Sequence, residues 1–244
     1  MIARAPARNP LIAPRLAGKI SAAAAVVLLV LMASPGNAQA PQAAPQAAPK
    51  TGSPAAAAPS ADKAASSGPV DVRGIIHVCS SCHGPGGHSI SSTFPRLAAQ
   101  QKDYLVAQLR AFRDHTRADP HAQTYMWGMA ARLSDEAIDG IADYYSKQPA
   151  VPGEPDASPE ADAGRKIFDE GISSQSVPAC KACHGDHAEG NAVIPRLAGQ
   201  HRDYIETQLR AFASKARAND IMHENSKNLT ADQIRDVAAY VRTQ

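Results

Sequence analysis

Apolar side chains recur at helical spacing in two stretches of this chain that lie 100 positions apart. Residues three and four positions apart fall on one face of an α-helix, so each stretch presents one apolar face. The two faces consist of Tyr104, Leu105, Leu109 and Phe112 and of Tyr204, Ile205, Leu209 and Phe212. We therefore predict an amphipathic helix in the middle of each half of the chain.

A second amphipathic pattern closes each half. It begins after Ser134 in the first half and after Thr230 in the second, and both residue types are good helix N-caps. Gln233 lies three residues after Thr230, where a capping box requires it. The predicted buried stripes consist of Ile138, Ile141, Ala142 and Tyr145 and of Ile234, Val237, Ala238 and Val241. We expect the last helix of each half at these positions.

A first helix is predicted near the start of each half. It covers Val70 to Val78 in the first half, and Pro159 to about Phe168 in the second. Ser158 is the expected N-cap of the second of these helices, and proline suits the first helical position. No stretch shows the alternation that is typical of strands. The pattern as a whole indicates an all-α protein.

The two halves are copies of one unit. The segment FPRLAAQQKDYLVAQLRAF, residues 94–112, corresponds to IPRLAGQHRDYIETQLRAF, residues 194–212. We expect domains at 70–148 and 159–244, joined by a proline-rich linker at 149–158. Each domain is small for one that must bury its own core, which favours a fold wrapped around a large apolar cofactor.

The composition before residue 70 differs from that of the repeats. Residues 1–38 are predicted to be a secretory signal, with a basic start and an apolar run at 20–32 that is shorter than the ~20 residues of a membrane span. An uncleaved membrane anchor is the alternative. Residues 39–69 are almost entirely alanine, proline, glutamine and serine, which predicts a disordered tether. We expect export to the periplasm.

Charge excludes one class of partner. The chain has 25 basic and 23 acidic side chains, and without the four basic residues of the predicted signal 21 basic side chains face 23 acidic ones. A nearly neutral mature chain without a basic stripe does not resemble a nucleic-acid-binding protein. No nucleic acid is therefore expected among its partners.

Every cysteine of the chain lies in one of two pentapeptides, CSSCH at 79–83 and CKACH at 180–184. This is the c-type haem attachment sequence, in which two thiols one helical turn apart bond to the haem and the adjacent histidine binds iron. Half of a zinc site or a redox dithiol is the alternative for a single C-x-x-C. Two copies without a leftover cysteine favour two covalent haems, held by Cys79, Cys82, His83, Cys180, Cys183 and His184.

The second axial ligand of each iron separates an electron carrier from a peroxidase or gas sensor. The candidates are Met126, Met129, His77, His88, His115 and His121 in the first half and Met222, His187, His201 and His223 in the second. Met126 precedes Ser134 by eight residues and Met222 precedes Thr230 by eight, so these two methionines hold the same position in the repeat. We therefore predict that Met126 and Met222 are the distal ligands.

This ligand assignment has a consequence for function, and it leaves Met129 with a different interpretation. A soft thioether ligand favours ferrous iron and leaves no open position for peroxide or oxygen, which argues for electron transfer and against catalysis at iron. Met129 corresponds to Asn225 in the second half and is interpreted as a core methionine beside the haem.

The motifs together resemble a known family. C-x-x-C-H-G, P-R-L-A-x-Q, D-Y-x-x-x-Q-L-R-A-F and a methionine eight residues before the last-helix cap, all in two copies after a signal, are similar to the periplasmic diheme cytochromes of the c4 type. The resemblance implies two tandem class I cytochrome c domains related by a pseudo-twofold axis, with the haem propionates facing each other. It also implies that the carbonyls of Pro95 and Pro195 orient His83 and His184.

The same resemblance places Arg96, Arg196, Tyr104 and Tyr204 near the haem propionates, with surface charge and helix packing as the alternative interpretation. It implies an electron carrier between a quinol-oxidising cytochrome complex and a terminal oxidase or another acceptor. An electron-transfer subunit of a dehydrogenase complex is the alternative, and a diheme peroxidase is a third hypothesis that requires an open distal site. Membrane association is expected only through such partners or an uncleaved anchor.

Overall fold

The computed structural model describes residues 70–244. The predicted signal at 1–38 and the predicted tether at 39–69 lie outside the described residues. Within 70–244 the chain is helical, and its only β-pairing is two isolated bridges, Ile172 with Val177 and Asn191 with Ile194. The all-α prediction is confirmed for this part of the chain. None of its helices is long and apolar enough to cross a membrane.

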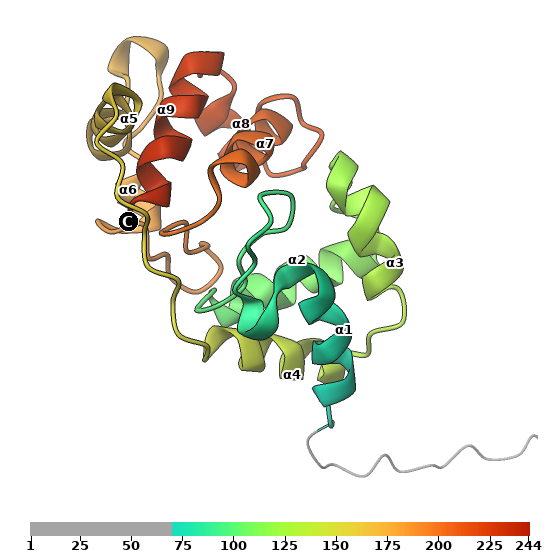
Figure 1. Cartoon of the computed structure of the whole chain (residues 1–244). Coiled ribbons are helices and arrows are strands. Elements are labelled where there is room, and N and C mark those ends of the chain that lie inside the picture. Colours follow the sequence, from blue (N-terminus) through green and yellow to red (C-terminus); the bar gives the residue numbers. More distant parts are fainter. Residues whose placement is uncertain (1–69) are drawn as a thin grey trace, which may run out of the picture. The chain divides into compact units, whose positions relative to one another are not determined.

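The two halves contain similar sets of helices (Figure 1). The first half has a 3₁₀ turn, η1 (Pro85–Gly87), and a π-helical turn, η2 (Ala122–Met126), between its α-helices. The second half has a 3₁₀ turn, η3 (Ser173–Gln175). The α-helices of the first half are α1 (Arg73–His83), α2 (Lys102–Arg113), α3 (Trp127–Ala130) and α4 (Asp135–Ser146), and those of the second are α5 (Pro159–Glu170), α6 (Lys181–His184), α7 (Arg202–Ala213), α8 (Asp220–Ser226) and α9 (Ala231–Arg242).

The predicted middle and last helices are confirmed, and so are their caps. The Ser134 hydroxyl accepts a hydrogen bond from the backbone N–H of Ala137 at 3.2 Å and so caps α4. Thr230 and Gln233 form the complete capping box of α9. These contacts depend on residues three positions apart, which is why the sequence pattern alone located both helix starts.

The predicted first helix of the first half is wrong in its boundaries. It begins at Arg73 instead of Val70, and it runs through the cysteine motif to His83 instead of ending at Val78. The Asp71 carboxylate accepts the backbone N–H of Arg73 at 3.1 Å, which satisfies a donor at the helix start and fixes the beginning there. In the second half α5 begins after Ser158 as predicted and continues to Glu170.

Each half has its own buried core. In the second half α5 crosses α9 at Gly164, where a Cβ atom would overlap the backbone carbonyl of Asp236 (Figure 1). In the first half the glycine at the close approach lies on the last helix instead. A Cβ atom on Gly140 would lie 2.9 Å from a methyl group of Val72. The buried core residues include Ile76, Leu105, Ile141 and Tyr145 in the first half and Ile167, Phe168, Val237 and Val241 in the second.

The segment expected to be the linker, 149–158, contains no helix or strand, but it is held against both halves. The backbone N–H of Glu154 donates to the carbonyl of Arg242 at 3.0 Å. The Glu154 carboxylate pairs with Arg96 of the first half at 3.1 Å and with Arg242 of the second. One carboxylate thus connects the two repeats.

Candidate functional site

The first cysteine–histidine centre lies on a single helix, α1. Cys79 is half-buried, Cys82 is exposed, and neither thiol is in a disulfide. His83 is buried, and its ring Nδ1 lies 2.9 Å from the carbonyl oxygen of Pro95. Because a carbonyl oxygen only accepts, Nδ1 carries the proton and Nε2 is left free to bind a metal. Burial lowers the pKa of His83, which keeps the ring neutral and suited to ligation.

The second centre repeats this arrangement at the start and end of α6. Nδ1 of the buried His184 lies 3.1 Å from the carbonyl oxygen of Pro195, so its Nε2 is also free. Burial lowers the pKa of His184 and raises the pKa of the Cys180 thiol to about 11. The expected orientation of both histidines by proline carbonyls is confirmed.

The donor set distinguishes haem from zinc. Burial also raises the pKa of Cys79, which keeps this thiol protonated. Within residues 70–244 no group of three or more His, Cys, Asp or Glu side chains is arranged to hold a metal ion. Two thiols one turn apart beside a neutral imidazole with a free Nε2 fit a covalent haem at each centre.

The two predicted distal methionines lie on different kinds of element. Met126 is the last residue of the π-helical turn η2 and packs against Phe112, Ala122 and Ala130. Met222 lies in the α-helix α8, and its backbone N–H donates to the Asn219 side chain at 2.9 Å. Both methionines are half-buried.

One aromatic ring connects the two sides of the first centre. The ring of Phe94 lies 6.1 Å from the His83 ring and 5.3 Å from the ring of Tyr125, the residue before Met126. Phe94 therefore contacts both the ring of His83 and the residue that precedes Met126. Met129 is 47% exposed, so it lies outside the buried core of residues 70–244, and its expected place beside the haem stays a prediction.

The other histidines are mostly engaged elsewhere. Ring nitrogens of three of them lie close to backbone carbonyls, and each of these pairs is 2.9 to 3.0 Å apart: His88 with Pro149, His201 with Ser89 and His223 with Phe212. His77 and His187 are exposed. His115 stacks on Trp127 with the ring centroids 4.1 Å apart. His121 differs from these, because its Nδ1 is buried without a hydrogen-bond partner.

A reciprocal ladder of hydrogen bonds joins the two halves. The side chain of Gln100 donates to the carbonyl of Arg196 and accepts from its N–H, at 2.9 and 2.8 Å. Gln200 makes the same pair of bonds to Arg96, at 3.0 and 2.9 Å. Both glutamines are buried. The ladder has the two-way symmetry expected of an interface between copies of one unit.

A buried charge cluster lies on the same interface. Arg117 donates to Gln208 and Tyr204 of the second half, and Arg217 donates to Gln108 and Tyr104 of the first. The guanidinium groups lie over rings of their own halves, Arg117 over Phe112 at 4.6 Å and Arg217 over Phe212 at 4.5 Å. Two buried cations face one buried carboxylate, Asp119, in the described part of the chain, and this excess positive charge suits the anionic propionate edge of a haem.

Sequence reasoning missed most of this interface. It selected Arg96, Arg196, Tyr104 and Tyr204, and the structure gives all four hydrogen bonds across the interface, the two arginines through their backbone N–H groups among others. Arg96 is therefore not a free surface charge, and the place of these four residues near the haem propionates stays a prediction. Sequence reasoning assigned no role to the glutamines or to Arg117 and Arg217. These residues recur at a constant offset of 100 in the sequence. That recurrence could have identified them, because polar residues that are present in both copies are expected to have the same function.

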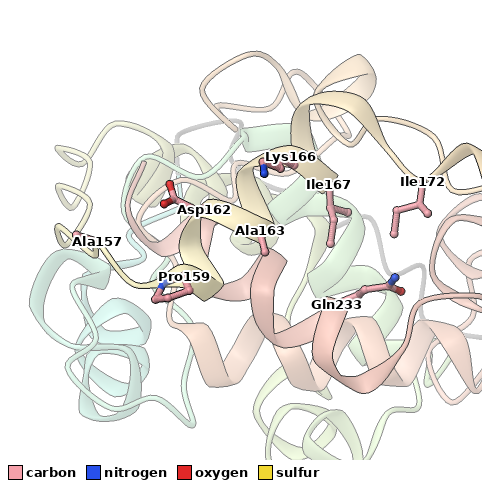
Figure 2. A pocket seen from close by; sticks show the side chains of 8 residues that line it. All are labelled: Ala157, Pro159, Asp162, Ala163, Lys166, Ile167, Ile172 and Gln233. Atoms are coloured by element: carbon pink, nitrogen blue, oxygen red, sulfur yellow. The ribbon is translucent and has the colours of Figure 1, made fainter. Parts of the chain in front are cut away.

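A surface groove in the second half lies apart from these centres. It is a cavity of about 530 Å³ whose side chains come from α5, the loops on either side of it and α9 (Figure 2). It contains no cysteine, histidine or methionine, so it does not belong to either haem centre. Its lining consists of Ala157, Pro159, Asp162, Ala163, Lys166, Ile167, Ile172 and Gln233.

Comparisons with known proteins agree with the geometry. The family model described as cytochrome c matches residues 70–147 and 161–244. Cytochrome c-552 of Acidithiobacillus ferridurans is 41% identical over 165 residues, which is 67% of this chain and 72% of that protein. The structure of cytochrome c4 from Acidithiobacillus ferrooxidans is 40% identical with a TM-score of 0.65, over 68% of this chain and 98% of that one.

A relative named for a different partner is also similar. The thiosulfate dehydrogenase electron acceptor of Thiomonas intermedia (strain K12) is 35% identical over 175 residues, which is 68% of this chain and 78% of that protein. Similarity over about two thirds of this chain is therefore shared by proteins named as cytochromes and by a protein named for its electron donor.

Proposed function

Because this chain belongs to the cytochrome c family, as a two-domain diheme cytochrome of the c4 type, we propose that it shuttles electrons in the periplasm with Met126 and Met222 as distal iron ligands. It is an electron carrier with two covalently bound haems c. A haem c supplies an iron that accepts and releases one electron.

We assign each haem to one repeat. Cys79, Cys82 and His83 hold the haem of a domain at 70–148, and Cys180, Cys183 and His184 hold that of a domain at 159–244. Residues 149–158 link the two domains. The hydrogen bonds to Pro95 and Pro195 support this assignment, because they orient each imidazole and strengthen its donation to iron.

The observation that carries the ligand proposal is the shared register of the two methionines. Met126 and Met222 each lie eight residues before the N-cap of a last helix, although one is on a π-helical turn and the other on an α-helix. In the first domain the competing candidate is His121, with its unpartnered buried Nδ1.

The test is the weak absorption band near ~695 nm that marks ferric iron bound by methionine sulfur. We expect Met126→Ala and Met222→Ala each to remove about half of this band. His121→Ala and Met129→Ala serve as matched controls and should leave it intact. Loss of the band in Met129→Ala, with Met126→Ala unaffected, contradicts the ligand assignment. A band that stays intact in both Met126→Ala and Met129→Ala also contradicts it, because a first haem bound by His121 contributes nothing to this band.

We propose a quinol-oxidising cytochrome complex as the electron donor and a terminal oxidase as the acceptor. Stopped-flow oxidation of the reduced protein by oxidase-containing membranes should be fast and only moderately sensitive to salt, since the mature chain is nearly neutral. Turnover of hydrogen peroxide in place of electron delivery would support the peroxidase hypothesis instead.

A second candidate is the electron acceptor of a dehydrogenase. The observation that favours it is the likeness to the thiosulfate dehydrogenase electron acceptor. Mixing the oxidised protein with a purified thiosulfate dehydrogenase and thiosulfate tests this candidate, because rapid reduction of both haems is expected only from a matching donor. Slow reduction by this enzyme together with fast reduction by the quinol-oxidising complex favours the first proposal.

The periplasmic location depends on the signal at 1–38, with 39–69 as a tether to the first domain. We expect the mature protein to begin after Ala38 and to be released with the periplasmic fraction. N-terminal sequencing of the purified protein checks this expectation. A chain that still begins at Met1 and pellets with membranes indicates an uncleaved anchor.

A further inference from the structure

Each of the two predicted distal methionines is followed by a residue whose ring carries an N–H donor. Trp127 follows Met126, and His223 follows Met222. The two positions are equivalent, because the repeat offset in this segment is 96. An indole and an imidazole differ in size and shape, so the feature that the two domains share here is the ring N–H.

In the first domain this donor is bonded to a residue outside its own turn. The indole N–H of Trp127 donates to the carbonyl of Arg117 at 2.8 Å. Arg117 is a fixed acceptor, because its buried guanidinium is bonded to Asp119 and to Gln208 of the second domain. The ring of Trp127 also stacks on His115, with the centroids 4.1 Å apart and the planes 15° apart. The indole is therefore fixed to the segment that follows α2.

In the second domain the shorter ring makes a corresponding bond. Nδ1 of His223 lies 3.0 Å from the carbonyl oxygen of Phe212, and because a carbonyl oxygen only accepts, this nitrogen is the donor. Phe212 is buried in the last turn of α7. In both domains the residue after the methionine is thus bonded at or just beyond the end of the middle helix.

The residue before each methionine is more exposed and makes a different kind of contact. Tyr125 is 41% exposed, and its ring lies 5.3 Å from the ring of Phe94. Ile221 is 71% exposed and has no polar side-chain atom. The hydrogen bond that both methionine segments have in common therefore lies on the C-terminal side of the methionine.

We propose that Trp127 and His223 are positioning residues for the distal ligands, and that the ring N–H of each holds the preceding methionine in place for the iron. A ligand group that is already fixed loses little freedom when it binds, so a held thioether competes better against other ligands for the sixth position. Both residues act through the backbone that they share with the methionine. The inference rests on the proposed function, because Met126 and Met222 must be the distal ligands.

The experiment measures how easily an added ligand displaces the methionine. Imidazole binds haem iron and, by replacing the thioether of the oxidised protein, removes the ~695 nm band. It is added at one fixed pH to the oxidised full chain with both haems. The first domain is measured in a Met222→Ala background and the second in a Met126→Ala background, so that the remaining band reports a single domain.

Trp127→Phe and His223→Phe are the test variants, because each keeps an aromatic ring and removes the N–H donor. In each variant we expect the imidazole concentration that removes half of the remaining band to fall about fivefold, which is the usual effect of losing one hydrogen bond. Tyr125→Phe is the matched control. It removes a hydroxyl on the other side of Met126, keeps the ring that contacts Phe94, and should leave this concentration unchanged.

The conservative variant His223→Asn keeps an N–H donor near the place of Nδ1 and should return the imidazole concentration towards the wild-type value. If it behaves like His223→Phe, the ring and not its N–H is responsible, and the proposal is overturned. Thermal unfolding followed by circular dichroism shows whether each variant is folded. A lower unfolding temperature with an unchanged imidazole concentration also overturns the proposal, because the bond then stabilises the domain without positioning the ligand.

The double variant Met126→Ala/Met222→Ala separates this proposal from the ligand assignment. We expect it to have no ~695 nm band, because neither iron then has a thioether ligand. A band that persists contradicts the ligand assignment, and the positioning role fails with it. A band that is lost here, together with unchanged imidazole concentrations in Trp127→Phe and His223→Phe, contradicts the positioning role alone.

Discussion

The segments that carry Met126 and Met222, the two predicted distal ligands, differ between the two domains. In the first domain Met126 lies seven positions after Asp119 and ends a π-helical turn without a side-chain cap. In the second, Met222 lies three positions after Asn219, and this asparagine caps a regular α-helix. The four extra residues are where the repeat offset falls from 100 to 96.

This comparison shows which features a duplicated domain keeps and which it can change. Each methionine lies eight residues before the cap of the following helix, a spacing that is expected if this helix positions an iron ligand. The polar residue that precedes each methionine, Asp119 or Asn219, has a different role in each domain. When a helix begins directly after the residue, its side chain is used as a cap. When the helix begins later, the side chain of Asp119 turns inward and binds Arg117.

The largest expected difference between the domains concerns the helix crossings. Gly164→Ala should lower the free energy of unfolding by about 3 kcal/mol, because the new methyl group overlaps the backbone carbonyl of Asp236, which cannot move away without separating α5 from α9. Gly74→Ala is the matched control in α1, where nothing lies within 4 Å of the added Cβ atom, and it should raise stability by about 0.5 kcal/mol. Urea titrations followed by circular dichroism measure both effects; equal changes in the two variants would contradict this account.

The helix crossings differ between the two domains, but the two sides of the hydrogen-bond ladder are equivalent. We therefore expect equal losses of unfolding free energy when either side of the ladder is removed. Gln100→Ala and Gln200→Ala should each cost about 2 kcal/mol, because each removes equivalent bonds to an arginine backbone and leaves buried groups unpaired. Gln148→Ala removes a single local bond to Tyr144 and should cost much less. The same urea titrations apply. Losses for Gln100 and Gln200 that differ by more than the experimental error would show that the two sides of the interface are not equivalent.

The segment of Met222 has a side-chain cap at the start of its helix and the segment of Met126 has none, so removal of this cap tests the difference between the two segments. Asn219→Ala should destabilise the second domain by about 1 kcal/mol and lower the temperature at which its share of the ~695 nm band disappears. Asn219→Asp keeps a capping oxygen and should behave like the wild type. Thermal titration of the band distinguishes the variants. If the alanine variant keeps its full band to the wild-type temperature, the cap does not hold Met222 in place.

The smallest expected effect concerns pH. His201 corresponds to Gln101 of the first domain, and each is bonded to a backbone carbonyl across the interface, at 2.9 Å. Burial, together with repulsion from Arg96, lowers the pKa of His201 below its ordinary value of 6.5. The unfolded chain therefore takes up the proton first, so stability is lost as the pH falls from about 6.5 through the lower pKa of the folded state.

His201→Gln copies the residue of the first domain and should keep the interface bond while flattening the dependence of unfolding free energy on pH between about 7 and 5. His187→Gln is the control, because His187 is exposed and should leave the pH profile unchanged. Urea titrations at several pH values measure the slope. An unchanged slope in His201→Gln would assign the pH dependence to other groups.

Local sequence patterns determined much of this protein. Both cysteine motifs, the middle and last helices, and the caps at Ser134, Ser158 and Thr230 were read from residues within one or two helical turns of each other. Helical periodicity and capping depend on such short separations, so they need no knowledge of the fold. The repeat then showed that Met126 and Met222 occupy equivalent positions. Their binding to iron stays a prediction.

Only the tertiary structure decided how the copies meet. The bonds of Gln100, Gln200, Arg117 and Arg217 join residues about 90 to 110 positions apart, and no local pattern specifies such partners. Asp119 and Asn219 are different, because their partners are local: Asp119 accepts from Arg117, two residues away, and Asn219 accepts from the N–H of Met222, three residues away. What the tertiary structure decided is that Arg117 also reaches Gln208 of the second domain, because docking brings a distant amide oxygen within reach of its guanidinium.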